Sequence, residues 1–321
     1  MCYRVELRPY YRQFKRPLTS NHGVWTHRQG IIIKLTNPTG KVGFAEIAPL
    51  PWFGSESFEE AWQFCQTLTP LLYSHQILTI PDSLPACQFG LESAYEAAEN
   101  PHPSLPQALP LQSALLPTGP HALQFWRSFF DQGHRTFKVK IGVAPLEEEI
   151  GRVQQLLQAF PPHCLLRLDA NGGLTPSQAR IWLEVCDRLD PPQIEFLEQP
   201  LPVAHFDTML DLSHQFRTLL ALDESVANLK HLQTFYQQGW RDVFVIKPAI
   251  IGSPRRLREF CQQNGIDAVF SSVLETAIGQ RAGLRLAAEL SQRVPGYGVN
   301  HWFEPDGLGN TDDFEQVWQR L

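Results

Sequence analysis

The sequence predicts an α/β protein, a (β/α)7β-type TIM barrel that carries an α+β capping domain. From about residue 107 onward, short apolar runs alternate with amphipathic helical stretches, which is the pattern of parallel βα units. Before that point, alternating apolar residues separated by turn residues indicate antiparallel strands. Seven or eight βα units close most readily into a barrel. An open doubly wound sheet is less favoured, because no G-x-G-x-x-G turn follows the first strand.

The expected organisation has three parts. Residues 1–104 form the capping domain, 105–292 the barrel, and 293–321 a segment that returns to the cap. Within this segment, residues 296–314 show no helical period. Residues 3–48 have strand patterning, with Asn37-Pro38-Thr39-Gly40 supplying the chemistry of a hairpin turn. Helical spacing marks 56–68 and 86–99. The loop at 19–29 is expected to close the barrel mouth.

The barrel elements follow one another in order. We expect strands at 111–116, 136–142, 164–170, 193–199, 218–224, 242–248 and 267–273. Helical patterns lie between several of them, at 145–160, 175–189, 229–239, 253–265 and 275–292. This strand–helix alternation is the main evidence for a parallel sheet.

Bulk composition excludes several classes of protein. The 321 residues are 43% apolar and 19% charged, values typical of a globular protein, and the net charge of −6 disfavours nucleic-acid binding. No run of ~18 apolar residues predicts a membrane helix, and the N-terminus lacks the layout of a signal peptide. The six cysteines are scattered without a C-x-x-C pair, which indicates reduced thiols. We therefore expect a cytoplasmic enzyme of undetermined oligomeric state.

Charged or polar side chains end successive predicted strands. In a barrel such residues meet at the mouth, where catalytic groups lie. Their spacing of 24 to 29 residues matches one βα unit per step. The residues are Lys140, Asp169, Glu198, Asp223, Lys247 and the pair Ser271 and Ser272.

The three carboxylates predict a metal site. Asp169, Glu198 and Asp223 would repel one another in a cavity of low dielectric, and a hard divalent cation with oxygen ligands removes that penalty. Mg²⁺ is the expected ion, with Mn²⁺ as a substitute, and the lack of His or Cys at these strand ends disfavours zinc. Glu195 and Glu224 are rivals because they lie close in sequence to the proposed ligands.

Two lysines share one face of a predicted strand. In TFKVKIG, Phe137, Val139 and Ile141 occupy one face while Lys138 and Lys140 occupy the other. A lysine beside a metal-bound carboxylate substrate can remove its α-proton once neighbouring cations and desolvation favour the neutral amine. The metal would stabilise the charge that develops on the substrate oxygens as an enediolate. We expect a small-molecule carboxylate as the substrate.

At this point the residues resemble a known family. K-x-K, then L-D-A-N, E-Q-P, D-E-S and I-K-P on successive units are similar to the enolase superfamily, in its muconate-lactonizing-enzyme-like subgroup. Three longer segments resemble the o-succinylbenzoate synthase family: 44–56, 133–142 and 270–279. The resemblance covers nearly the whole chain.

This resemblance implies a reaction and roles for the residues. The reaction is Mg²⁺-dependent dehydration of 2-succinyl-6-hydroxy-2,4-cyclohexadiene-1-carboxylate to 2-succinylbenzoate, on the route to menaquinone or phylloquinone. Asp169, Glu198 and Asp223 would bind the metal, and Lys140 would act as base and then as acid. Lys247 would stabilise the enediolate by its charge. Lys138 would favour the neutral amine of Lys140 and neutralise the substrate carboxylate, and Asn171, Ser271 and Ser272 would seat the substrate.

The same scaffold supports other outcomes. A racemase of N-succinyl amino acids or a dipeptide epimerase would use Lys140 and Lys247 as two proton-transfer groups on opposite faces of the substrate. A dipeptide epimerase is expected to carry an acidic residue for the peptide amine, so Ser271 and Ser272 favour a substrate without that amine. A metal-binding barrel without activity is a remote third possibility, since such a protein has no need for buried amines.

Overall fold

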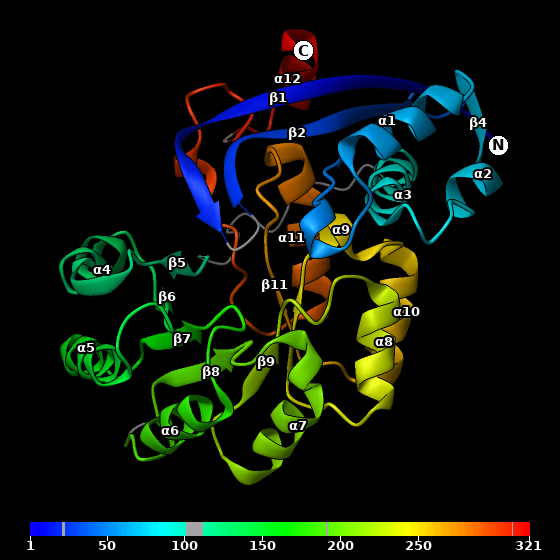
Figure 1. Cartoon of the computed structure of the whole chain (residues 1–321). Coiled ribbons are helices and arrows are strands. Elements are labelled where there is room, and N and C mark those ends of the chain that lie inside the picture. Colours follow the sequence, from blue (N-terminus) through cyan, green and yellow to red (C-terminus); the bar gives the residue numbers. More distant parts are fainter. Residues whose placement is uncertain (21–22, 101–111, 191, 310) are drawn as a thin grey trace.

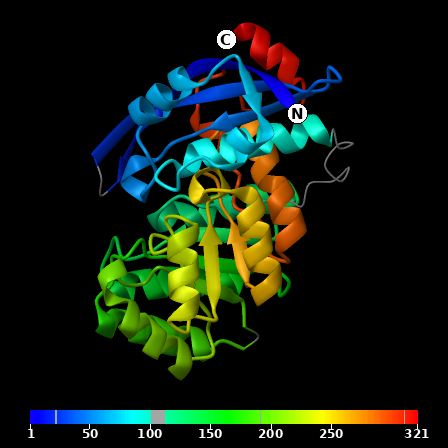
Figure 2. The ribbon, with the colours of Figure 1, turned by 90° about the vertical axis from the view of Figure 1, so that its right-hand side faces the viewer.

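The computed structural model describes residues 1–20, 23–100, 112–190, 192–309 and 311–321. Two sheets organise these residues (Figure 1). The antiparallel sheet and its helices occupy the upper part of the view, and the parallel sheet with its surrounding helices occupies the lower part. Seen from the side, the antiparallel sheet lies across one end of the parallel one (Figure 2). The predicted boundary at 104/105 and the first residue of the predicted strand 111–116 lie outside the described residues.

The antiparallel sheet holds four strands in the described part of the chain, in the order β3-β2-β1-β4. They are β1 (Cys2–Ser20), β2 (Gly23–Thr36), β3 (Val42–Ile47) and β4 (Leu71–Tyr73). The predicted turn between β2 and β3 is present: the Asn37 side-chain oxygen accepts hydrogen bonds from the backbone N–H groups of Thr39 and Lys41. This Asx-type turn explains why the chain reverses there.

Three helices pack beside this sheet. They are α1 (Phe58–Thr67), α2 (Ser74–Leu78) and α3 (Pro85–Glu99), with a 3₁₀ turn, η1, at Pro51–Phe53. Ser57 and Glu60 form a reciprocal capping box that sets the start of α1. Helix α3 approaches β3 closely because Gly43 lacks a side chain: a Cβ there would lie 2.1 Å from the carbonyl oxygen of Ala94. We call β1–β4, α1–α3 and η1 the cap.

The parallel sheet contains seven strands among the described residues, in the unbroken order β11-β10-β9-β8-β7-β6-β5. This confirms the predicted barrel class, and each strand falls within a predicted range. Their bounds are β5 Ala114–Leu115, β6 Thr136–Lys140, β7 Leu165–Asp169, β8 Ile194–Glu198, β9 Leu220–Leu222, β10 Val243–Ile246 and β11 Ala268–Phe270.

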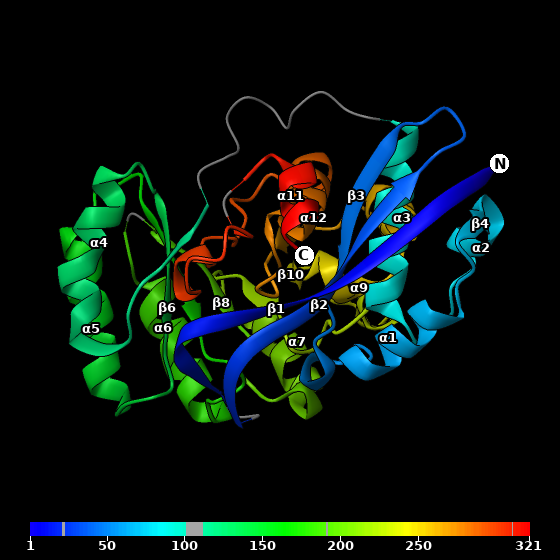
Figure 3. The ribbon, with the colours of Figure 1, turned by 90° about the horizontal axis from the view of Figure 1, so that it is seen from above.

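Helices surround the parallel sheet on its outside (Figure 3). Those that match predicted patterns are α5 Leu146–Ala159, α6 Pro176–Asp187, α8 Leu229–Gln237, α10 Pro254–Asn264 and α11 Ala277–Leu290. The sequence analysis missed α4 Ala122–Asp131, α7 Phe206–Gln215 and the short α9 Pro248–Ile251. Helices α4 and α7 start at His121 and His205, which make no side-chain cap, so the usual start signal is absent. Short 3₁₀ turns precede them, η2 at Gly119–His121 and η3 at Val203–His205.

The tail joins the two ends of the parallel sheet. Gly296 donates its backbone N–H to Phe270 at 2.8 Å, and its carbonyl accepts from Ser272 at 3.0 Å. On the other side, Ser113 donates to the carbonyl of Pro295 at 2.9 Å. A short stretch around Gly296 therefore bridges the gap between β11 and β5.

After this bridge the tail returns to the cap. Phe303 forms a β-bridge with Phe14, and Arg12 pairs with Asp306 at 2.7 Å. The tail contains the 3₁₀ turn η4 (Asn300–Trp302) and a terminal helix, α12 (Phe314–Arg320). Helix α12 begins at the last residue of the stretch 296–314, and the sequence analysis made no prediction for the residues that follow. Seven residues are too few to show a period, and α12 is held mainly by tertiary packing.

Two further features bear on the sequence predictions. All six cysteines are free thiols, and every one except Cys2 is buried. Among the described residues, no helix is long and apolar enough to cross a lipid bilayer.

Candidate active site

Strand register brings the predicted carboxylates together. Lys140 pairs with Asp169 across β6 and β7, and Asp169 pairs with Glu198 across β7 and β8. Asp223 follows directly after β9, the next strand. All three carboxylate residues are buried, with exposed fractions of 3%, 2% and 5% for Asp169, Glu198 and Asp223. The three carboxylates therefore lie at the carboxyl ends of three neighbouring strands.

Lys138 sits between two of these carboxylates. Its Nζ lies 2.8 Å from Oδ2 of Asp169 and 2.7 Å from Oε1 of Glu198. Burial alone would lower the pKa of Lys138, but Asp169, Glu198 and Asp223 together raise it. Lys138 is thus held as an ammonium ion that neutralises the carboxylates, a contact that the sequence analysis did not foresee.

The carboxylates respond to this environment in opposite directions. Burial opposes ionisation of Asp169, yet Lys138 and Lys140 lower its pKa. Burial and the charge of Asp169 raise the pKa of Glu198 to about 8, against the lowering effect of Lys138. The three carboxyl groups outnumber the two ammonium groups that contact them, Lys138 and Lys247, and such an excess of buried acids favours a divalent cation.

Lys247 lies at the end of β10, the strand next to β9, which Asp223 follows. It follows β10, is only 8% exposed, and donates a hydrogen bond to Oδ1 of Asp223. Its Nζ also lies 3.8 Å from the ring centre of Phe53, a residue of η1 in the cap. Phe53 thus covers a predicted catalytic residue with an aromatic face.

Lys140 faces a chamber between the barrel and the cap. The chamber has a volume of about 540 Å³. Its walls are mainly apolar and aromatic, from the cap (Trp25, Trp52), from α4 and the preceding loop (Leu116, Phe125) and from the tail (Trp302). Lys140 is exposed toward it, and its amine makes no hydrogen bond or ion pair with any described residue. Trp25 comes from the predicted mouth-closing segment 19–29, of which residues 21–22 lie outside the described residues.

Of the three residues predicted to seat the substrate, Asn171 contacts the carboxylate cluster, whereas Ser271 and Ser272 follow β11 and have other protein partners. Asn171 has a positive φ of 43°; its N–H donates to Asp169 and its side chain to Glu224, both at 3.1 Å. The Ser272 hydroxyl donates to Glu275 at 2.6 Å and accepts from Leu274 at 2.8 Å. Ser271 lies at the bridge to Gly296. Their contact with substrate stays a prediction.

The two rival acids have distinct positions. Glu195 pairs with Arg167 at 2.6 Å and Arg293 at 2.9 Å, three residues before the end of β8, away from the carboxylate cluster. Glu224 lies beside the cluster: burial and then Asp223 raise its pKa to about 7, and its Oε2 has no hydrogen-bond partner among the described residues. Glu224 is therefore a buried acid next to the proposed metal ligands.

Gln199 is a supporting residue that the sequence analysis missed. It is fully buried, with a positive φ of 35°. Its side-chain oxygen accepts from the backbone N–H groups of Asp223 and Ser225 at 3.0 and 3.2 Å. Gln199 thereby fixes the chain at Asp223. Its place directly after Glu198 in E-Q-P was the signal that could have identified it.

Two more supporting residues clamp the loops around the site. Glu149 accepts hydrogen bonds from the backbone N–H groups of three consecutive residues, 142–144, just after Lys140. Arg28 is 3% exposed and donates to the carbonyls of Ala48, Pro49 and Val273. It thus ties the segment after β11 to the cap. Only tertiary structure reveals Arg28, because its partners lie far away in sequence.

The donor set suits Mg²⁺, although the carboxylates are not arranged around a common point. In the described part of the chain, no three His, Cys, Asp or Glu side chains form a preassembled metal-binding group. The ammonium groups of Lys138 and Lys247 contact the carboxylates instead. Three buried carboxyl groups at the ends of adjacent strands match the preference of a hard cation for oxygen ligands. Burial and Asp169 raise the pKa of Glu198 to about 8, and a bound cation would favour its charged form.

Comparison with known proteins agrees with this geometry. The family described as "Enolase C-terminal domain-like" matches residues 122–316, and the one described as "MenC, N-terminal domain" matches residues 10–98. An o-succinylbenzoate synthase from Thermosynechococcus vestitus is 38% identical over 99% of both chains. Another, from Edwardsiella ictaluri, is 32% identical over 84% of this chain and 81% of its own.

Solved structures show the same relationship. The crystal structure of o-succinylbenzoate synthase from Thermosynechococcus elongatus, complexed with Mg in the active site, has a TM-score of 0.91 and 37% identity, covering 99% of this chain and 100% of that one. The L-Ala-D/L-Glu epimerase from Bacillus subtilis, at 19% identity and a TM-score of 0.75, shares the fold over 96% of this chain and 91% of its own.

The capped parallel barrel, with lysines and carboxylates at its strand ends, defines a member of the enolase superfamily. Within it, the chain belongs to the o-succinylbenzoate synthase family, as the sequence motifs indicated. It is therefore an enzyme of the carbon–oxygen lyase class.

Proposed function

We propose that this enzyme catalyses the Mg²⁺-dependent dehydration of 2-succinyl-6-hydroxy-2,4-cyclohexadiene-1-carboxylate to 2-succinylbenzoate, on the cytoplasmic route to menaquinone or phylloquinone. The main observation in favour is the relative position of the lysines. Lys140 faces the apolar chamber from β6, whereas Lys247 follows β10, four strands further along the sheet. Similarity to o-succinylbenzoate synthases over 99% of the chain supports the choice of substrate.

Asp169, Glu198 and Asp223 would hold the metal ion, with Mn²⁺ as a substitute for Mg²⁺. When bound, the ion would neutralise negative charge that develops on the substrate carboxylate. Lys138 already neutralises Asp169 and Glu198 at 2.8 and 2.7 Å, so it would keep positive charge beside the reacting carboxylate. Its role is therefore electrostatic.

Lys140 carries the proton in this proposal. Its free amine would take the proton from the ring carbon that bears the carboxylate, giving an enediolate. The same lysine would return a proton to the departing hydroxyl, which leaves as water while the ring becomes aromatic. One group can serve both steps when proton and hydroxyl leave from the same face. Lys140 has no ion pair with any described residue, which supports this use because no carboxylate holds its side chain away from the substrate.

Lys247 would act from the opposite face without transferring a proton. Its ammonium contacts Asp223 and lies beneath the Phe53 ring, so it is fixed in place and shielded from water. A fixed cation in a dry site stabilises developing negative charge strongly. The aromatic walls of the chamber would hold the ring and the methylenes of the substrate.

The test is loss of the ultraviolet absorbance of the cyclohexadiene substrate, measured with Mg²⁺, with EDTA, and in variants. We expect turnover that EDTA abolishes and that Lys140→Ala reduces by at least 10³-fold. Lys41→Ala is the matched control: Lys41 is an exposed lysine of the β2–β3 turn, and its removal should change nothing. Persistent turnover in Lys140→Ala would contradict the role of the base.

The racemase and epimerase alternatives are distinguished with the same variants. Exchange of the α-proton of N-succinyl amino acids or dipeptides in D₂O, without turnover of the cyclohexadiene, would move the function to one of them. Lys247→Arg separates the roles further, since arginine keeps the charge but cannot act as a base at neutral pH. Dehydration should survive in part in Lys247→Arg, whereas racemisation should not.

A further inference from the structure

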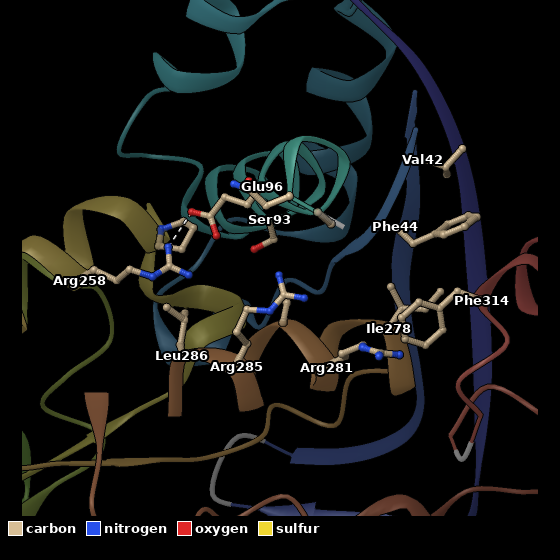
Figure 4. Close-up of a pocket in the computed structure, with 14 residues that line it drawn as sticks. Val42, Phe44, Ser93, Glu96, Arg258, Ile278, Arg281, Arg285, Leu286 and Phe314 are labelled. Atoms are coloured by element: carbon tan, nitrogen blue, oxygen red, sulfur yellow. Dashed lines mark hydrogen bonds and ion pairs between the residues drawn. The ribbon is translucent and has the colours of Figure 1, made fainter. Parts of the chain in front are cut away.

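A second cavity lies where the cap packs against the barrel (Figure 4). It has a volume of about 190 Å³ and shares no lining residue with the chamber that Lys140 faces. Cap elements β3 and α3 form one wall, barrel helices α10 and α11 the other, and Phe314 of α12 closes one end. We call it the junction cavity. Nothing in the proposed reaction uses it.

Three arginines line the junction cavity. Arg258 is committed to the protein, since it pairs with Glu96 at 2.6 Å and also with Glu289. Among the described residues Arg281 has one ion pair, with Asp312 at 3.3 Å, and that aspartate side chain is 95% exposed. The Arg281 guanidinium also lies 5.1 Å from the centre of the Phe314 ring. Arg285 makes no hydrogen bond or ion pair with any residue that the structure describes. Figure 4 shows its guanidinium pointing across the cavity toward Ser93 of α3.

The charges around Arg285 do not balance. Glu96 is the only acid that lines the described walls of the cavity, and Arg258 already neutralises it. Burial lowers the pKa of Arg285; Glu289 and Glu96 oppose this effect, whereas Arg281 and Arg258 add to it. A half-buried guanidinium with unused donors, next to a second weakly paired one, is the arrangement that binds a carboxylate or phosphate through two parallel hydrogen bonds.

The remaining wall is apolar. The apolar lining comes from Val42 and Phe44 of β3, from Phe314 of α12, and from Ile278 and Leu286 of α11, the helix that also carries Arg281 and Arg285. A volume of 190 Å³ equals that of about six water molecules in the liquid, which is room for a single ring with one head group. An inorganic anion would leave the apolar wall unused.

We propose that the junction cavity binds a small carboxylate that carries one apolar ring, with its head group on Arg285 and Arg281. Because the walls come from both cap and barrel, such a ligand would strengthen the docking of the two parts. The cavity is also close to a structural link between them: Glu46 of β3 accepts hydrogen bonds from the backbone N–H groups of Thr276 and Gly279, at the start of α11.

The test uses the full-length, Mg²⁺-loaded protein with 2-succinylbenzoate present in excess to occupy the active site. This product carries a succinyl chain beyond the single ring and head group for which the junction cavity has room. Benzoate is titrated by calorimetry, and benzamide, acetate and phosphate serve as the uncharged, ringless and inorganic probes. We expect saturable benzoate binding at one site, with at least tenfold weaker binding of the other three. Arg285→Gln should weaken benzoate binding at least tenfold, while Arg255→Gln, an exposed arginine of α10 outside the cavity, should leave it unchanged.

Each other result overturns the proposal. Equal affinity of Arg285→Gln and the unaltered protein for benzoate would place the binding elsewhere, including in an active site that the product fails to fill. Equal affinity for acetate or phosphate would refute the ring, and no saturable benzoate binding would refute the site. Circular dichroism checks that Arg285→Gln folds, and Arg281→Gln provides a second variant with the same expected direction.

Discussion

The amine of Lys247 lies 3.8 Å from the centre of the Phe53 ring, although the two residues belong to different parts of the fold. Phe53 is in the 3₁₀ turn of the cap and Lys247 follows a barrel strand. A desolvated cation–π contact of this kind is worth about 2 kcal/mol. The cap therefore contributes directly to the position of a residue in the candidate active site.

Phe53→Leu tests this contribution. Leucine keeps an apolar cover but removes the aromatic face, so we expect kcat to fall by about tenfold, in line with a loss of about 1.4 kcal/mol. Steady-state kinetics measure it. Phe64→Leu is the control. Phe64 is a half-buried phenylalanine of α1 for which the described structure shows no cation–π contact with Lys247. An unchanged kcat in Phe53→Leu would show that Phe53 only fills space.

Lys138 takes the place of a cation between Asp169 and Glu198, at 2.8 and 2.7 Å. Removing one partner of a buried ion pair costs about 3–5 kcal/mol, because the other charge is left uncompensated. We expect Lys138→Gln to lower the free energy of unfolding by this amount in EDTA and by less in Mg²⁺, since the metal replaces the lost charge. Urea unfolding in both conditions measures the difference. Equal losses would mean that metal and Lys138 do not share the carboxylates.

The side-chain oxygen of Gln199 accepts a hydrogen bond from the backbone N–H of Asp223 at 3.0 Å and so holds Asp223 in place. Removing a residue that orients a ligand typically weakens metal binding by 10–100-fold. We expect Gln199→Leu to raise the dissociation constant for Mg²⁺ within that range, measured by calorimetry. Gln238→Leu, at an exposed position after α8, serves as the control. A variant that binds Mg²⁺ normally would contradict the role of Gln199.

Glu275 makes stability depend on pH. It is 1% exposed, and burial, opposed by the Ser272 hydroxyl, raises its pKa from 4.5 to about 7. The folded protein thus holds this proton more tightly than the unfolded chain, so the contribution is complete below pH 4.5 and is lost as the pH rises through 7. At 1.4 kcal/mol per pKa unit the loss is about 3 kcal/mol.

Glu275→Gln removes this dependence, because glutamine does not titrate. Relative to the unaltered protein, the variant should gain about 3 kcal/mol of stability between pH 4.5 and pH 8, measured by urea unfolding at intermediate values. Glu59→Gln, an exposed site on α1, should show no such trend. A constant difference between Glu275→Gln and the unaltered protein across this range would contradict the assignment.

Local patterns were enough to predict much of the fold. Strand alternation at 136–142 placed Lys138 and Lys140 on one face, and the repeat of βα units brought Asp169 and Glu198 to the same end of the sheet. Helices with clear start signals were predicted, such as α1 with its capping box. Helices α4 and α7, which begin at uncapped histidines, were not. Local signals therefore predict elements well only where the ends of those elements are marked.

By itself, the sequence determined the order of the strands, the residues at their ends and the family to which the chain belongs. Tertiary structure decided which groups meet: Phe53 over Lys247, Lys138 between Asp169 and Glu198, and the Gly296 segment that bridges the parallel sheet. The physical reason is range. A residue's own neighbours set its strand or helix, but pairing of buried charges and closure of a barrel depend on packing between distant segments, which no local pattern records.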